Sequence, residues 1–164
     1  MNEPSPGRVY PPAWRVVVAF ITAPAIAALL MATIAPAYSD ALPMLERILK
    51  TAILYAVFGA YPFTLVLGLP AYLLLRHHIK PTIINCMAVG SAVVVLPALI
   101  ISMMPSGVTQ SSVGGRAIIV DGQRTLYGWQ TFAESLLHLA AYGAVGGFVF
   151  WLIVAGFRRS ADVR

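Results

Sequence analysis

Three polar side chains near the C-terminal end of the chain have the types and the spacing that chemistry could use. Glu134, His138 and Tyr142 follow one another at intervals of four residues, which places them on one face of an α-helix. They stand in an otherwise apolar segment, where ionisable groups are costly and usually face a bundle interior or water. A carboxylate, an imidazole and a phenol in that arrangement predict a proton relay or contacts to a polar ligand.

Each of the three side chains also has a structural interpretation. The segment TFAE at 131–134 has the T-x-x-E form of a capping box, in which two side chains satisfy backbone N–H groups at the start of a helix. We favour this role for Glu134, and we expect Tyr142 to be a packed aromatic with its hydroxyl bonded to a neighbouring helix. His138 has no capping role, and we expect a neutral ring hydrogen-bonded to Glu134 or to a neighbouring helix.

Other reactive side chains do not form a recognisable site. His77 and His78 are adjacent, so on a helix they would point in different directions and make a poor metal pair. Cys86 is the only cysteine, which excludes an intrachain disulfide and a cysteine-based metal site. The sequence has no Walker loop, H-E-x-x-H, G-x-S-x-G or dinucleotide fingerprint. We predict no catalytic residue, metal or cofactor, and an intramembrane enzyme is the last of our three hypotheses.

The composition predicts an integral membrane protein. Of the 164 residues, 59% are hydrophobic and 10% are charged, whereas a soluble domain carries about 25% charged residues. The apolar residues form four blocks of roughly 20 residues or more, enough to cross a hydrocarbon core about 30 Å thick. We predict an all-α protein surrounded by the lipid bilayer, with four transmembrane helices in an up-down bundle, at about 14–35, 48–75, 82–104 and 131–157.

A secretory signal peptide is the alternative for the first block. Arg8 and Arg15 precede the block, and the Ala-Pro-Ala sequence at 35–37 resembles a small-residue cleavage site. We favour a retained helix because the block exceeds the apolar core of about 7–15 residues found in signal peptides. Proline between the two alanines is also a poor choice for a peptidase that needs extended backbone.

The segment 105–130 predicts a small β-hairpin between the third and fourth helices. The segment 117–120, which is rich in β-branched residues, and the segment 123–127 flank the dipeptide Asp121-Gly122, which tolerates the positive φ angles of a tight hairpin turn. In the second block, Pro62 and Pro70 each remove a backbone hydrogen bond and predict kinks, the first near Phe58.

The basic residues predict the orientation. Seven of the eleven Lys and Arg residues fall in or beside the segments that four crossings place on one side, which are the proline-rich tail 1–13, the turn 76–80 and the basic tail 158–164. Since Lys and Arg concentrate in cytoplasmic loops, we expect both termini in the cytoplasm, the hairpin outside and a bacterial inner membrane. Nucleic acid is not an expected partner, because these residues flank the blocks instead of lining one helix or strand.

Small residues on the fourth block predict close helix packing. Ala140, Gly143, Ala144 and Gly147 leave a shallow groove that another helix can enter, although their spacing does not say which helix. We therefore expect an accessory or structural subunit that packs with a larger membrane complex or with itself, through such faces and the external hairpin. The alternative is an oligomeric transporter or channel subunit, with a polar path past the carboxylate and imidazole described above.

Overall fold

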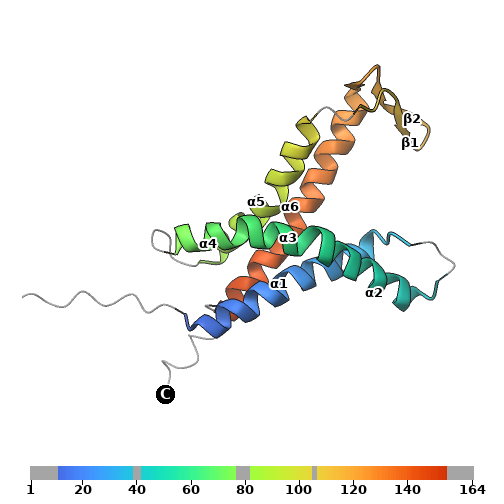
Figure 1. The fold of residues 1–164 in the computed structure, drawn as a ribbon. Helices are drawn as coiled ribbons and strands as arrows, with labels where there is room; N and C mark the ends of the chain where they lie inside the picture. The colour runs from blue at the N-terminus through green and yellow to red at the C-terminus, as the bar shows by residue number, and fades with distance from the viewer. Residues whose placement is uncertain (1–10, 39–41, 77–81, 105–106, 155–164) are drawn as a thin grey trace, which may run out of the picture.

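The computed structural model describes residues 11–38, 42–76, 82–104 and 107–154, and this part of the chain is mostly helical (Figure 1). Its helical elements are α1 (Ala13–Ile34), α2 (Met44–Tyr55), the π-helical turn η1 (Ala56–Ala60), α3 (Tyr61–Phe63), the π-helical turn η2 (Thr64–Gly68), α4 (Leu69–Leu75), α5 (Ile83–Met103) and α6 (Leu126–Val154). Elements α2 to α4 follow one another without a gap and form one helix, Met44–Arg76. With α1, α5 and α6, the described chain has four helices long and apolar enough to cross a membrane.

The helix limits agree with the prediction for two helices and differ for the other two. Helices α1 and α5 begin and end within one residue of the predicted limits. The second helix begins at Met44, four residues early, where an ion pair of 2.7 Å between Glu46 and Lys50 supports its first turns. The predicted helices at about 14–35 and 48–75 had left residues 44–47 in the loop between them. Most of the N-terminal tail, the paired histidines, residues 155–157 and the C-terminal tail lie outside the described residues.

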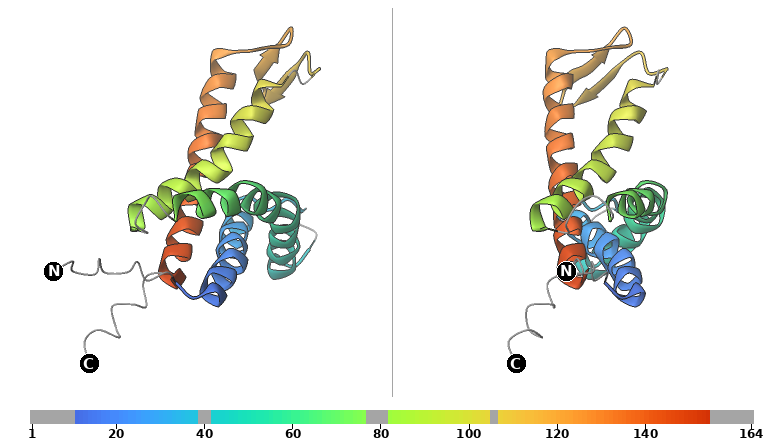
Figure 2. Two further views of the ribbon diagram at one scale, coloured as in Figure 1. Left: turned by 60° about the vertical axis from the view of Figure 1, so that its left-hand side comes forward. Right: turned by 90° about the vertical axis from the view of Figure 1, so that its left-hand side faces the viewer.

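Helix Met44–Arg76 departs from α-helical geometry before each of its prolines. The turn η1 precedes Pro62 and η2 precedes Pro70. In the first of these wider turns, the N–H of Tyr61 reaches back five residues to the carbonyl of Ala56, the hydrogen bond that defines a π-helical turn. Proline has no N–H and its ring crowds the preceding turn, so the chain widens there. Figure 2 shows this helix curving along its length.

Helices α5 and α6 approach each other so closely that backbone meets backbone. A Cβ atom added to Gly90 would collide with Gly143 and Gly147, and one added to Gly147 would collide with the carbonyl of Cys86. The predicted groove on the fourth helix is therefore filled by α5 of the same chain.

A hydrogen bond lies on the same contact. The hydroxyl of Ser91 on α5 donates to the carbonyl oxygen of Ala140 on α6 at 2.8 Å. Ala144, the remaining small residue of the predicted groove, is half-buried. Three of the four predicted groove residues thus lie at the α5 contact.

Helix α1 packs against α6 and against the Met44–Arg76 helix through small residues. Its buried apolar side chains other than Pro24 are all alanines, at positions 19, 23, 28 and 32. Larger groups complete the contact: the hydroxyl of Tyr61 donates to the carbonyl of Ile21 on α1 at 2.9 Å, and that of Tyr55 donates to the carbonyl of Ala35, just after α1, at 2.8 Å. The helices are held by close approach and hydrogen bonds, which is typical of packing in lipid.

Three aromatic rings join α1, α4 and α6. Phe20, Tyr72 and Phe150 meet edge to face, with ring centroids 5.2–5.9 Å apart, a favoured geometry for aromatic pairs. Figures 1 and 2 show the α5–α6 pair rising from the crossing with the other two helices and carrying the strands at its far end.

The segment between α5 and α6 holds a three-stranded antiparallel sheet. Its strands are β1 (Ser111–Val113), β2 (Arg116–Val120) and β3 (Gln123–Arg124), in that order. Asp121 and Gly122 have φ angles of 50° and 75°, which confirms the predicted hairpin turn. Strand β1, which pairs with β2 across a Gly-Gly turn, was not predicted. The last strand ends at Arg124 and not near Tyr127 as predicted, because α6 has already begun.

The glycine contact predicts unequal effects for two Gly→Ala substitutions. Gly147→Ala is expected to lower the free energy of unfolding by about 1–3 kcal/mol, since the added methyl group overlaps the α5 backbone. Gly59→Ala, the control, meets nothing within 4 Å and should change stability little. Unfolding in mixed micelles, followed by circular dichroism, measures both. Equal effects of the two substitutions would contradict the contact.

Candidate functional site

The structure places all three predicted polar residues on α6, but it does not bury them together. Glu134 and His138 are exposed, and Tyr142 is half-buried. The Nδ1 atom of His138 lies 2.8 Å from the backbone carbonyl oxygen of Glu134. Because a carbonyl oxygen only accepts, Nδ1 carries the proton and donates it, which leaves Nε2 as the ring atom able to interact with a partner. The imidazole is thus bonded to the backbone of Glu134 and not to its carboxylate.

The capping-box interpretation of Glu134 is wrong. Helix α6 begins at Leu126, so Glu134 stands more than two turns inside it. The hydroxyl of Thr131 donates to the carbonyl of Tyr127 within the helix, at 3.0 Å. The cap is Thr125, whose hydroxyl accepts the N–H of Gly128 at 3.0 Å.

The same threonine also ties the helix to the sheet. Its hydroxyl donates to the carbonyl of Ala117 on β2 at 2.8 Å, and its N–H donates to the carbonyl of Ile118 at 3.1 Å. Gly128 fits against the same strand, since a Cβ there would collide with Ile118. The sequence reasoning missed this cap because it began the helix at the apolar run and not at the threonine before it.

The exposed polar residues belong to a longer face of α6, which we call the outer face. It consists of six residues at alternating intervals of four and three: Glu134, His138, Ala141, Val145, Phe148 and Leu152. Five of them are exposed and Val145 is half-buried. Such alternation is the pattern of a coiled-coil seam. The faces of α6 that contact α5 and α1 lie elsewhere on the helix, at Gly143 and Gly146.

The register of α5 against α6 gives the level of these residues along the pair. Gly90 lies opposite Gly143, and the two helices run in opposite directions, so His138 lies level with Val95. Val95 is close to the middle of α5. Glu134 lies one helical turn nearer the sheet.

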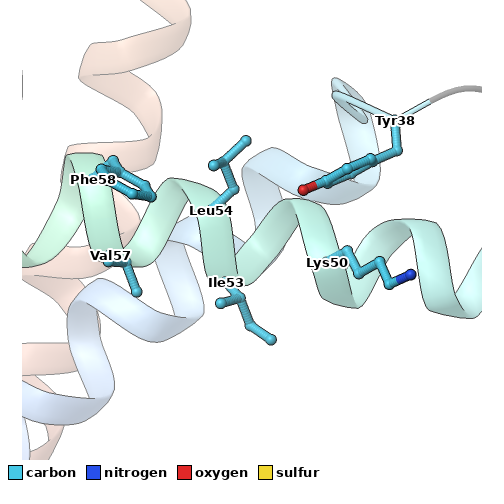
Figure 3. A pocket seen from close by; sticks show the side chains of 6 residues that line it. All are labelled: Tyr38, Lys50, Ile53, Leu54, Val57 and Phe58. Carbon is cyan, nitrogen blue, oxygen red and sulfur yellow. The ribbon is translucent and has the colours of Figure 1, made fainter.

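A hollow of about 400 Å³ lies on another part of the surface, beside α2 and η1 (Figure 3). It is lined by Tyr38, Lys50, Ile53, Leu54, Val57 and Phe58. Figure 3 shows the ammonium group of Lys50 pointing away from the four apolar side chains, and this group is paired with Glu46. The hollow therefore combines four apolar side chains with the phenol of Tyr38 and the ion-paired Lys50.

The described residues contain no cluster of metal-ligating side chains. No group of three His, Cys, Asp or Glu side chains in the described ranges lies close enough to hold a metal ion. Neither the hollow beside α2 nor a second one, between α5 and the sheet, is lined by Glu134 or His138. Both polar side chains are exposed, so they are open to contact with whatever covers the outer face.

Sequence reasoning also missed the environment of Arg124. Its guanidinium lies over the ring of Phe132 at 4.2 Å and over that of Trp129 at 5.4 Å, within the range of cation–π attraction. On the same sheet, Arg116 lies over Tyr127 at 5.4 Å. The sequence signal that could have predicted these contacts is the pair of arginines followed closely by three aromatic residues.

Comparison with known proteins does not add to this geometry. No family model, curated protein or solved structure matches the chain at a significant level. Its function therefore has to be inferred from its own residues.

The two candidate caps predict opposite results for a pair of substitutions. Thr125→Val should cost about 1–2 kcal/mol and speed hydrogen exchange at the start of α6, since it removes the cap of Gly128 and the bond to β2. Thr131→Val should have little effect, because it removes only a bond within the helix. Hydrogen exchange with mass spectrometry compares them. Faster exchange in Thr131→Val alone would restore the capping-box interpretation.

Proposed function

We propose that this chain is a four-span integral membrane protein, and that it acts as an accessory or structural subunit of a membrane complex. Four helices of sufficient length and apolarity support the spans. Large apolar side chains such as Phe58, 76% exposed, and Leu137, 71% exposed, cover the surface, while the buried positions are mostly alanine and glycine. Lipid tolerates that distribution, whereas in water it would favour aggregation.

The orientation that we propose follows from the basic residues. Both termini face the cytoplasm of a bacterial inner membrane, and the sheet lies outside. This arrangement leaves Arg116 and Arg124 on the external side, within a set of four basic residues opposed by seven on the other side.

The proposed partner surface is the outer face of α6. The observation that carries the proposal is that His138 is exposed yet level with the middle of α5. In a spanning protein it would lie near mid-depth in the bilayer, where polar groups are costly and charged ones cost about 2.5–3.5 kcal/mol. A helix packed on this face would give Nε2 of His138 and the carboxyl of Glu134 hydrogen-bond partners.

The transport alternative fits this face less well. A polar path between copies of the chain would need polar groups along the whole length of α6. Beyond His138, the outer face continues as Ala141, Val145, Phe148 and Leu152, which offer a permeating ion no ligand. The pattern of small and large apolar residues favours a helix–helix contact.

Photo-crosslinking tests the partner surface. A benzophenone amino acid at Ala141 in native membranes should give a protein adduct of defined mass, because the partner helix lies against it. The same probe at Leu96 of α5, 52% exposed, should give lipid adducts only. An adduct of twice the chain mass identifies a second copy, and a larger one identifies another subunit. Lipid adducts alone at both positions would refute the proposal.

Cysteine labelling tests the orientation. Cys86 is the only cysteine, so Cys86→Ala provides a background for single new cysteines. In intact spheroplasts a membrane-impermeant maleimide should label Ser112→Cys on β1, while Ser160→Cys should react only after lysis. The reverse pattern, or equal labelling of the two, would overturn the proposed topology.

A further inference from the structure

A second hollow lies at the far end of the α5–α6 pair, between the end of α5 and the β2–β3 hairpin. It measures about 610 Å³. Its walls include Ala98, Ile101, Met103 and Met104 on one side, and Ile119 and Arg124 on the other. Among the described residues that line it, Arg124 is the one that carries a charge. Ser102 and Gly122 also line it, so the hollow combines an apolar part with polar groups and the cation of Arg124.

Arg124 packs against two aromatic rings, and its N–H groups can still bind an anion. Its guanidinium lies over Phe132 and Trp129, which fixes its plane without using its N–H groups. Within the described ranges it forms no ion pair with a carboxylate. A guanidinium has five N–H donors in a fork that matches two oxygens of a phosphate group. A preset fork of this kind is suited to an anion.

The position of the hollow favours the phosphate of a lipid headgroup as that anion. Met103 ends α5, and a span that ends there reaches the level of the lipid headgroups. Trp129 and Tyr127 stand at the same end of α6, and such aromatics concentrate at membrane interfaces. Met103 and Met104 are 81% and 60% exposed, so their flexible side chains offer an apolar surface beside the cation.

We propose that this hollow binds an anionic glycerophospholipid, with the phosphate on Arg124 and an acyl chain along Ile101 and Met103. The proposal rests on the membrane-spanning placement proposed above. An anionic headgroup suits the site better than a zwitterionic one, because the described residues that line the hollow include no carboxylate to receive a headgroup amine. The bound lipid supplies the counter-charge that Arg124 lacks among the described residues.

The test measures lipid binding to the purified, delipidated chain in detergent by native mass spectrometry. Phosphatidylglycerol, phosphatidylcholine and inorganic phosphate are titrated separately. We expect phosphatidylglycerol to bind more tightly than phosphatidylcholine, and Arg124→Gln to weaken it about 10-fold or more, the range for a hydrogen bond to a charged group. Arg116→Gln is the matched control, since it removes the same charge from the same sheet without touching the hollow.

A second pair of variants guards against misfolding of Arg124→Gln, which also loses its ring contacts. Ala98→Phe fills the hollow and leaves Arg124 intact, so it should weaken phosphatidylglycerol binding as well. Ala92→Phe adds the same ring at an exposed position on α5 and should not. Circular dichroism confirms that each variant keeps its helices.

Three results would overturn the lipid site. Equal losses in Arg124→Gln and Arg116→Gln would show attraction to general surface charge. Equal binding of the two lipids would remove the anionic preference, and inorganic phosphate binding as tightly as the lipid would identify a free anion as the ligand. Since the titration is done in detergent, it can fail while the labelling and crosslinking results stand, or succeed while they fail.

Discussion

The backbone contact between α5 and α6 is the constraint on which the other features depend. At Gly90, Gly143 and Gly147 the two helices approach so closely that no side chain fits between them. This proximity aligns the helices, and it brings the end of α5 next to the strands that precede α6. The level of His138, the hollow beside Arg124 and the placement of the sheet all follow from it. Association by small residues is also the mode that remains available where lipid removes the hydrophobic driving force.

That contact covers the groove of small residues that the sequence had suggested for a partner. Spacing alone predicts a groove on the fourth helix, but a groove can be filled from within the chain or from outside it. Here α5 fills it, and a different face of the same helix is left exposed. The exposed face contains Glu134 and His138, so these polar residues lie on the surface that we propose for a partner.

The sequence predicted long apolar helices well and their beginnings less well. Hydrophobic length placed α1 and α5 to within a residue, and the Asp121-Gly122 pair located the hairpin turn. The start of α6 was missed because Thr125 caps the helix from within a strand-like segment, where periodicity carries no signal. The outward direction of Glu134 and His138 was also beyond reach, since it depends on which faces of α6 are occupied by α1 and α5.

The wide turns of helix Met44–Arg76 also set the phase of its side chains. Each of the π-helical turns η1 and η2 takes up more residues than an α-helical turn, so the side chains beyond it are rotated relative to their positions in an uninterrupted α-helix. A helical wheel drawn for this segment would therefore assign its faces wrongly. Deleting one residue from η1 would rotate everything beyond it and turn the Tyr72 ring away from Phe20.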